Sequence, residues 1–171
     1  DGEIETARKA AEERGLTGKY VLALQNTTQQ PLLPALENRA LRERLFKASV
    51  NRADQGGEND TRLLLARIAT LRAQKAALFG EPDWASYVMY DRMAKQPATA
   101  LNFMQQMVPA LAATQRQEAA LLNEKIAAEG GDFTVQPWDW YRYAEMVRKD
   151  RYAIDENAVK PYFEINRVLE D

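Results

Sequence analysis

The sequence contains no histidine and no cysteine in its 171 residues. Without histidine, Ser-His-Asp and Cys-His nucleophilic catalysis are excluded from this chain, and zinc sites built on imidazole or thiolate ligands are excluded with them. Without cysteine, no disulfide, thiol redox centre or c-type haem attachment forms. A carboxylate-only site for magnesium or calcium is the metal site that the composition still permits.

An excess of charge of one sign is also missing. The 23 basic and 25 acidic residues leave a formal net charge of −2, which gives no electrostatic reason to expect a nucleic acid or an anionic membrane as partner. No apolar run reaches about eighteen residues, so we expect no membrane span. Residues 1–5 lack the basic and apolar regions of a signal peptide. We expect the cytoplasm as the compartment, with the periplasm as the alternative.

Serine occurs twice and glycine eight times, whereas alanine occurs 27 times and leucine 18 times. Because alanine and leucine are strong helix formers, the composition predicts an all-α fold. We expect an irregular bundle of about seven helices in one helical region, residues 1–171. One short segment, residues 19–25, has strand character. A single strand cannot form a sheet, so this segment either pairs outside the chain or lies extended over the helices.

Helical spacing of apolar residues and the caps around them predict where the helices lie. Asp139 is expected to cap a helix that begins at Trp140, and Pro109 is expected to kink the longest helix. The buried side of that helix should carry Leu101, Met104, Val108, Leu111, Leu122 and Ile126. The expected helices are 3–14, 34–50, 61–79, 82–94, 97–129, 140–150 and one that follows a cap at Asp155.

Candidate catalytic chemistry rests on carboxylates, because there is no histidine. Adjacent acids such as Glu12 and Glu13 point ~100° apart on a helix, so they do not face one substrate. Residues 54–60 have the composition of a calcium loop but not its spacing, and a plain flexible loop is the favoured interpretation. We therefore predict no catalytic residue and no metal ligand in this chain.

The densest aromatic stretch, residues 137–143, is the strongest local signal. Its tryptophan and tyrosine side chains combine apolar area with a hydrogen-bonding group, so they are suited to line a substrate cleft. The favoured structural alternative is that Trp138 and a tyrosine pack into the core while Asp139 caps a helix. The possible cleft-lining residues are Trp138, Asp139, Tyr141 and Tyr143.

Six stretches together carry a resemblance to a known family. They are LQNTTQQP at 24–31, NRALRERLF at 38–46, LRAQKAALFG at 71–80, MAKQP at 93–97, QPWDWY at 136–141 and KPYFE at 160–164. In this order they resemble the M3 family of zinc metallopeptidases, the thimet oligopeptidase and neurolysin family, and within it the peptidyl-dipeptidases. The blocks at 136–141 and 160–164 are the most specific.

The resemblance implies an all-helical peptidase in which two lobes enclose a deep channel. In such enzymes zinc is held by the two histidines of H-E-x-x-H and a later glutamate, and the peptidyl-dipeptidases release dipeptides from the free C-terminus of short peptides. This chain has no H-E-x-x-H, which in the family follows the region similar to 160–164. The resemblance therefore implies a catalytically inactive fragment from the channel wall, with zinc only in the parent enzyme.

As such a fragment, the chain would have the remaining catalytic lobe as its partner, and short peptides would be substrates of the parent. Separated from that lobe, it would expose apolar surface and self-associate. The alternative is a stand-alone helical module that binds a peptide or protein in a groove between helices. That alternative predicts a natural gene that ends near Asp171 and cooperative unfolding of the isolated chain. A carboxylate-based hydrolase would require hydrolysis that survives a zinc chelator.

Overall fold

The computed structural model describes residues 2–25, 30–152, 156–165 and 169. Within these residues there are helices and no strand, which confirms the all-α prediction. Seven of the elements are α-helices and one is a short 3-10 helix. They are α1 (Gly2–Glu12), α2 (Arg39–Val50), α3 (Arg62–Leu78), α4 (Trp84–Met89), α5 (Pro97–Ala128), α6 (Pro137–Tyr152), α7 (Glu156–Val159) and η1 (Lys160–Phe163).

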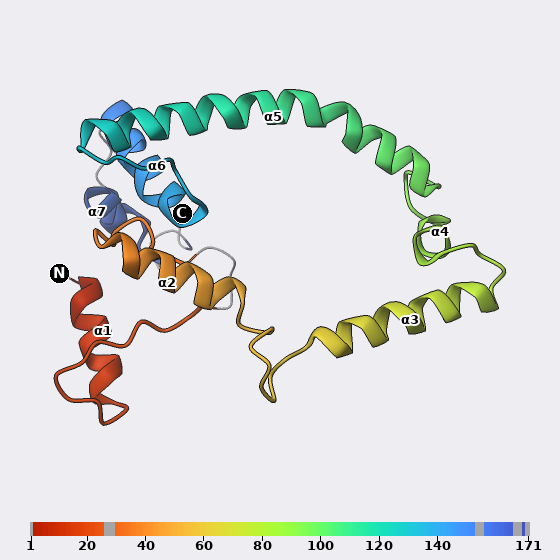
Figure 1. Cartoon of the computed structure of the whole chain (residues 1–171), viewed down its shortest axis with the longest axis horizontal. Coiled ribbons are helices and arrows are strands. Elements are labelled where there is room, and N and C mark those ends of the chain that lie inside the picture. Colours follow the sequence, from red (N-terminus) through yellow and green to blue (C-terminus); the bar gives the residue numbers. More distant parts are fainter. Residues whose placement is uncertain (1, 26–29, 153–155, 166–168, 170–171) are drawn as a thin grey trace.

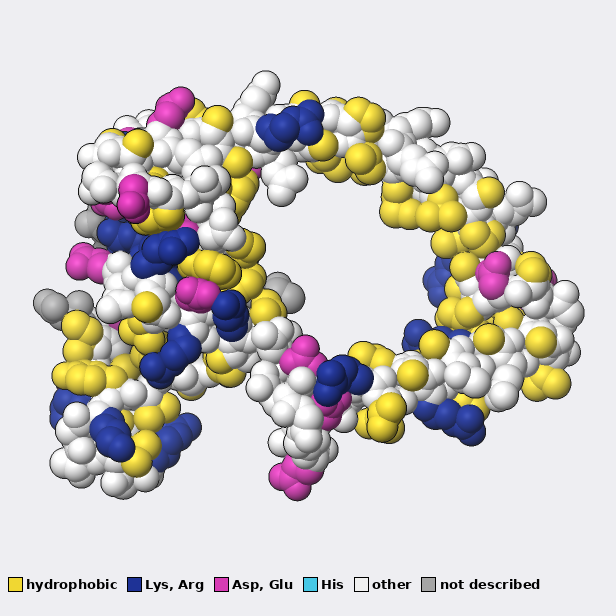
Figure 2. Space-filling view, viewed as in Figure 1, with side chains coloured by type: hydrophobic (Ala, Val, Ile, Leu, Met, Phe, Trp, Pro, Cys, Tyr) yellow, Lys and Arg dark blue, Asp and Glu magenta, His cyan; other side chains and the backbone are white. Residues whose placement is uncertain are grey.

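The helices follow one another around an open ring (Figure 1). The 32-residue α5 arches along one side, α3 lies opposite, and α4 contacts both. We call the end of the ring at α4 the far end, and the end where α2, α6 and the C-terminal part of α5 meet the near end. At the near end α6 packs against both α5 and α2, which closes the ring, and α1 lies outside it beyond α2. Figure 2 shows that side chains leave the centre of the ring open. The described helices are all too short or too polar to cross a membrane.

The hydrophobic core lies at the near end, where α5 meets α6. Leu122 and Ile126 of α5 and Tyr143 of α6 are at most 5% exposed. Phe133 and Val135, from the link between the two helices, pack against them. This link passes very close to α5, because a Cβ on Gly131 would lie 2.7 Å from Cγ2 of Ile126. Glycine is therefore required there by space rather than by backbone angle.

The helix expected at 34–50 begins five residues later. Residues 31–35 form turns, in which Leu33 is fully buried. The side chain of Asn38 accepts a hydrogen bond of 3.0 Å from the backbone N–H of Leu41, which makes Asn38 the N-cap of α2. Pro34 therefore belongs to the turn before the helix and not to its first turn.

The helix expected at 140–150 begins earlier, with Pro137 as its first residue. Proline suits this position because its missing N–H would have no partner there. Asp139 is thus the third residue of α6, not its cap, and its carboxylate accepts a 3.2 Å bond from the N–H of Gln136. The helix expected at 82–94 runs from Trp84 to Met89, and its N-cap is Asp83, whose side chain accepts a hydrogen bond from the N–H of Ser86.

The remaining expectations concern Pro109, residues 19–25 and the last helix. α5 continues through Pro109, and Figure 1 shows it arched along its length. Residues 19–25 lie over the helices: the N–H of Val21 donates to the carbonyl of Ala7 in α1, at 2.9 Å. α7 and η1 occupy the region of the last expected helix, whereas its cap, Asp155, lies outside the described residues.

Candidate functional site

A buried ion cluster centred on Asp139 joins α2 to α6. Asp139 is 0% exposed. Its Oδ1 accepts a 2.9 Å bond from Nη2 of Arg42, and its Oδ2 accepts a 2.9 Å bond from Nη2 of Arg39. The Nε of Arg39 lies 3.1 Å from both oxygens. One carboxylate therefore faces two guanidinium groups, so a buried charge is paired and hydrogen-bonded.

Arg42 is almost as buried as its partner, with 2% of its surface exposed. Its Nη1 donates to the carbonyls of Leu36 and Glu37, each at 2.9 Å, in the turn before α2. Its Nε is buried and has no hydrogen-bond partner among the described residues. Arg42 thus fixes the entry to α2 as well as the contact with α6.

Arg39 is the more accessible of the two arginines, with 35% of its side chain exposed. Its guanidinium lies 4.0 Å from the centre of the Phe133 ring and 5.7 Å from that of Trp138. Aromatic rings attract the cation electrostatically, so the two rings orient Arg39 toward Asp139.

Tyr143 lies on the core side of the cluster. It is 5% exposed, and its ring lies edge-on to Phe133 with centroids 6.4 Å apart. The guanidinium of Arg42 lies 5.9 Å from its centre. Burial raises the pKa of the Tyr143 phenol, and the negative charge of Glu129 raises it further. Tyr143 therefore stays protonated at neutral pH. Its side chain packs in the hydrophobic core with Leu122 and Ile126.

Trp138 and Tyr141, the other two predicted residues, are half-buried. The Trp138 ring lies edge-on to Phe46 of α2, with centroids 6.4 Å apart, and Nζ of Lys47 lies 5.2 Å from its centre. Its indole Nε1 is buried without a hydrogen-bond partner among the described residues. The Tyr141 side chain makes no hydrogen bond or ring contact with another described residue. The structure thus gathers Trp138, Asp139 and Tyr143 around the two arginines but not Tyr141.

This arrangement joins α6 to α2 and to the turn before α2. Both Asp139 oxygens accept hydrogen bonds from guanidinium groups and the side chain is buried, so the carboxylate is engaged in holding the two helices together. Sequence reasoning missed Arg39 and Arg42. The sequence signal for them is their i, i+3 spacing, which places both arginines on one face of α2. The structure shows that this face lies opposite the buried carboxylate of Asp139.

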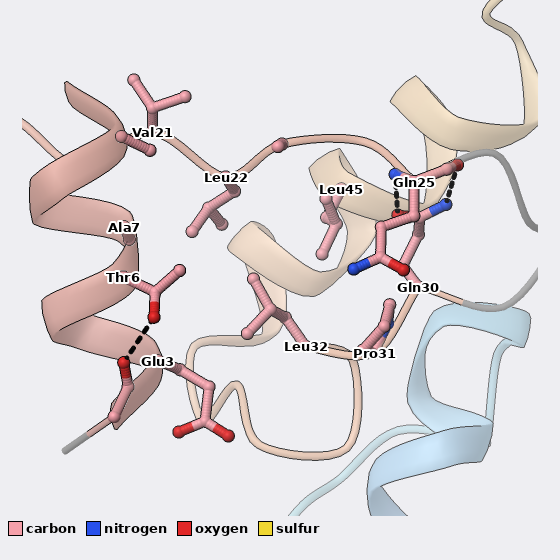
Figure 3. Close-up of a pocket in the computed structure, with 13 residues that line it drawn as sticks. Glu3, Thr6, Ala7, Val21, Leu22, Gln25, Gln30, Pro31, Leu32 and Leu45 are labelled. Carbon is pink, nitrogen blue, oxygen red and sulfur yellow. Dashed lines mark hydrogen bonds between the residues drawn. The ribbon is translucent and has the colours of Figure 1, made fainter. Parts of the chain in front are cut away.

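A pocket lies outside the ring, between α1, residues 21–25, residues 30–32 and Leu45 of α2 (Figure 3). Its volume is about 570 Å³. Gln30, which is 1% exposed, forms its floor and donates a 2.8 Å bond to Oγ of Ser49. Glu3 is the single carboxylate in its wall, and the other walls are mainly apolar. The pocket suits an apolar group, and it holds no pair of acids for hydrolysis.

In the loop at 54–60, the carboxylate of Asp60 already accepts hydrogen bonds from neighbouring residues of the chain. Oδ1 of Asp60 accepts the backbone N–H of Arg62, and Oδ2 accepts that of Gly56. The guanidinium of Arg62 bonds to the same carboxylate and, together with these N–H groups, holds the pKa of Asp60 well below its usual range. Across the described residues, no three or more acidic side chains gather where they would hold a metal ion.

A long apolar surface covers the far side of the ring. α3 buries one residue, Ala76, and the two buried residues of α5 both lie near its C-terminal end. The expectation that residues 101–111 form a buried side is therefore wrong for this chain: Leu101, Met104, Val108 and Leu111 are 50–60% exposed. Figure 2 shows hydrophobic side chains along this part of the ring.

We refer to residues 62–111 as the apolar arm. Monomeric proteins seldom expose contiguous apolar surface of this kind unless something binds there. Its exposed large hydrophobic residues are Leu63, Leu64, Leu65, Ile68, Leu71, Leu78, Phe79, Tyr90, Met93, Leu101, Phe103, Met104, Met107, Val108 and Leu111.

Comparison with known proteins gives consistent matches. The family described as Peptidase family M3 matches residues 32–170. Dipeptidyl carboxypeptidase of Escherichia coli is 46% identical over 169 residues, which cover 99% of this chain and 25% of that protein. Oligopeptidase A of Haemophilus influenzae is 31% identical, covering 97% of this chain and 25% of its own length. A probable cytosolic oligopeptidase A of Arabidopsis thaliana is 28% identical over 90% of this chain. The chain spans about a quarter of the length of the first two relatives.

Proposed function

Because this chain belongs to peptidase family M3, we propose that it is a helical portion of a longer zinc-dependent peptidase that removes dipeptides from the C-terminal end of short peptides. The observation that carries the proposal is the 46% identity with a dipeptidyl carboxypeptidase along 99% of the chain. The identity with an oligopeptidase A over a similar span is 31%, which favours the dipeptide-releasing activity over general oligopeptide cleavage.

The zinc ligands and the general base of this peptidase lie outside the chain in our proposal. The residues present do not fit a catalytic zinc site, since there is no histidine or cysteine to bind the ion. The fully buried carboxylate of Asp139 is already paired with two arginines. We therefore expect the isolated chain to hydrolyse no peptide.

The role of the chain in the longer protein is to build one wall of the substrate channel. The Asp139 cluster holds the near end of the ring together, and the apolar arm offers the surface on which the rest of the enzyme packs. The partner of the arm is thus the remaining catalytic lobe, and short peptides are the substrates of the whole. We place this enzyme in the cytoplasm, which cell fractionation with an antibody against the chain tests.

The decisive experiment compares the isolated chain with the protein expressed from its complete reading frame. Each is incubated with a short peptide that has a free C-terminus and with the same peptide amidated at its C-terminus, and the products are identified by mass spectrometry. We expect the longer protein to release a dipeptide from the free peptide only, and to lose this activity with a zinc chelator. We expect no product from the isolated chain.

Two results would overturn the proposal. Hydrolysis by the isolated chain in the presence of chelator would assign the activity to carboxylates of this chain. A reading frame that ends near Asp171 would leave no room for a zinc site, and the stand-alone binding module would replace the peptidase.

A further inference from the structure

Residues 20–25 form an extended segment that is held at both ends but unpaired in between. Tyr20 and Val21 favour strands, and residues 19–25 belong to no helix or strand of the structure. Figure 3 shows the chain running from beside α1 toward α2 through Val21, Leu22 and Gln25. Such a segment has two edges, because successive residues present their N–H and C=O groups to opposite sides.

One edge is already bonded to the protein. The N–H of Val21 donates to the carbonyl of Ala7 at 2.9 Å, and the N–H of Gln25 donates to Oε1 of Gln30 at 3.0 Å. The carbonyl of Gln25 accepts from Nη1 of Arg52, also at 3.0 Å. Val21 and Gln25 are four residues apart, so an extended chain presents both to the same side. This anchoring fixes the direction in which the other edge faces.

The opposite edge consists of Tyr20, Leu22 and Leu24. Their backbone groups make no hydrogen bond to another residue that the structure describes. We call these three residues the free edge. An edge of this kind is a template for a further strand, which would satisfy its N–H and C=O groups in register.

An apolar pocket beside the free edge could accept the side chains of an added strand. Leu22 lines the 570 Å³ pocket together with Leu32 and Leu45. A strand laid along the free edge places alternate side chains toward one face, where this apolar pocket receives them. Gln30, which also lines the pocket, is buried and hydrogen-bonded to Gln25 and to Ser49.

We propose that the free edge pairs with an extended segment of the same longer protein, so that residues 20–25 become a strand of a small sheet. This inference rests on the proposed function, because it requires the longer protein. The chain covers 25% of its dipeptidyl carboxypeptidase relative, which leaves most of that polypeptide outside it. A strand within the same molecule has a high effective concentration, which favours it over a free peptide as the occupant.

Residue-resolved hydrogen exchange tests the proposal, with the isolated chain and the longer protein measured under identical conditions. The amides of Leu22 and Leu24 are expected to exchange about 100-fold more slowly in the longer protein. The amide of Ala23, on the bonded edge, is expected to change little and serves as the internal control. Similar exchange of Leu22 and Leu24 in both proteins overturns the proposal.

Proline variants of the longer protein give a second readout that does not depend on activity. Leu24→Pro removes an N–H from the free edge, whereas Ala23→Pro removes one from the opposite edge, and Leu24→Ala controls for the lost side chain. We expect Leu24→Pro alone to abolish the slow exchange of Leu22. Equal effects of the two prolines would contradict the assignment of the edges.

The remaining outcomes separate this inference from the proposed function. Slow exchange in the isolated chain on addition of an alternating Val-Thr hexapeptide, with none in the longer protein alone, would identify a free peptide as occupant and overturn the proposal. A longer protein that releases dipeptides but leaves the free edge open contradicts this inference alone. A reading frame that ends near Asp171 removes both.

Discussion

The two ends of the ring use similar helices in opposite ways. At the near end, α2, α6 and the end of α5 enclose a core and a buried ion cluster. At the far end, the apolar arm has leucines at the same helical spacing, yet Leu63 is 85% and Leu78 is 86% exposed. The difference shows that the near end completes its own packing among the described residues, whereas the far end leaves the apolar faces of α3 and α5 exposed.

The largest expected effect is at the near end, from Asp139→Ala. Removal of the carboxylate leaves Arg42 charged, buried and without a counter-ion, which costs about 3–5 kcal/mol in the free energy of unfolding. Urea unfolding followed by circular dichroism measures the loss. Asp132→Ala removes an exposed acid from the neighbouring link and serves as the control. Equal stability of the two variants would contradict a structural role for the cluster.

A core truncation compares the two ends directly. Ile126→Ala removes a side chain that is 1% exposed and is expected to cost about 2–4 kcal/mol. Leu63→Ala makes a similar truncation in the apolar arm, and we expect it to change the free energy of unfolding by less than about 0.5 kcal/mol in the isolated chain. In the longer protein the cost of Leu63→Ala should rise if the arm packs there. A large cost in the isolated chain would mean that the arm is already covered.

Substitution of Gly131, which lies very close to α5, is expected to have an intermediate effect on the free energy of unfolding. Gly131→Ala places a methyl group 2.7 Å from Ile126, so the link must move, at a cost of about 1–3 kcal/mol. Gly57→Ala is the matched control, because its Cβ would meet nothing within 4 Å. A thermal melt that separates the two variants confirms the tight packing at the near end.

Self-association of the isolated chain tests whether the exposed surface of the apolar arm is adhesive, with surface substitutions that remove no buried side chain. Leu64→Glu together with Phe103→Glu places charges on the apolar arm, and we expect the pair to reduce concentration-dependent association of the isolated chain. Gln74→Glu with Gln106→Glu adds the same charge to exposed positions of the same helices. Light scattering over a range of concentrations gives the mass of each. Association that persists unchanged in the first pair would place the contact elsewhere.

The smallest effect is the pH dependence of the loop that leads into the arm. The pKa of Asp60 is lowered in the folded chain by its bonds to Arg62, so its contribution is present above the unfolded pKa. That contribution is lost as the pH falls below about 4, toward the folded pKa. Asp60→Asn should therefore reduce the acid sensitivity of the amides around Gly56, which hydrogen exchange measures. An unchanged pH profile would show that the interaction is screened by solvent.

The order and type of the helices could be predicted because alanine, leucine and the caps act locally. Asp83 shows this, since its capping bond to Ser86 spans three residues. Asp139 shows the limit: a cap was expected, but Arg39 and Arg42, 100 and 97 residues away, make it an ion-pair centre. The stripe at Leu101 and Met104 shows a second limit. Periodicity identifies an apolar face but not whether its partner lies in the same chain.

The contact between Arg39 and Asp139 also has a kinetic consequence. It closes a loop of 100 residues, whereas most of the packing elsewhere in the ring joins helices that are neighbours in sequence. Loop closure carries an entropic cost that grows with loop length, and contacts of high sequence separation slow folding. We therefore expect the individual helices and the packing of α5 against α6 to form first, and the joining of α2 to α6 to be the late step that turns a string of helices into a ring.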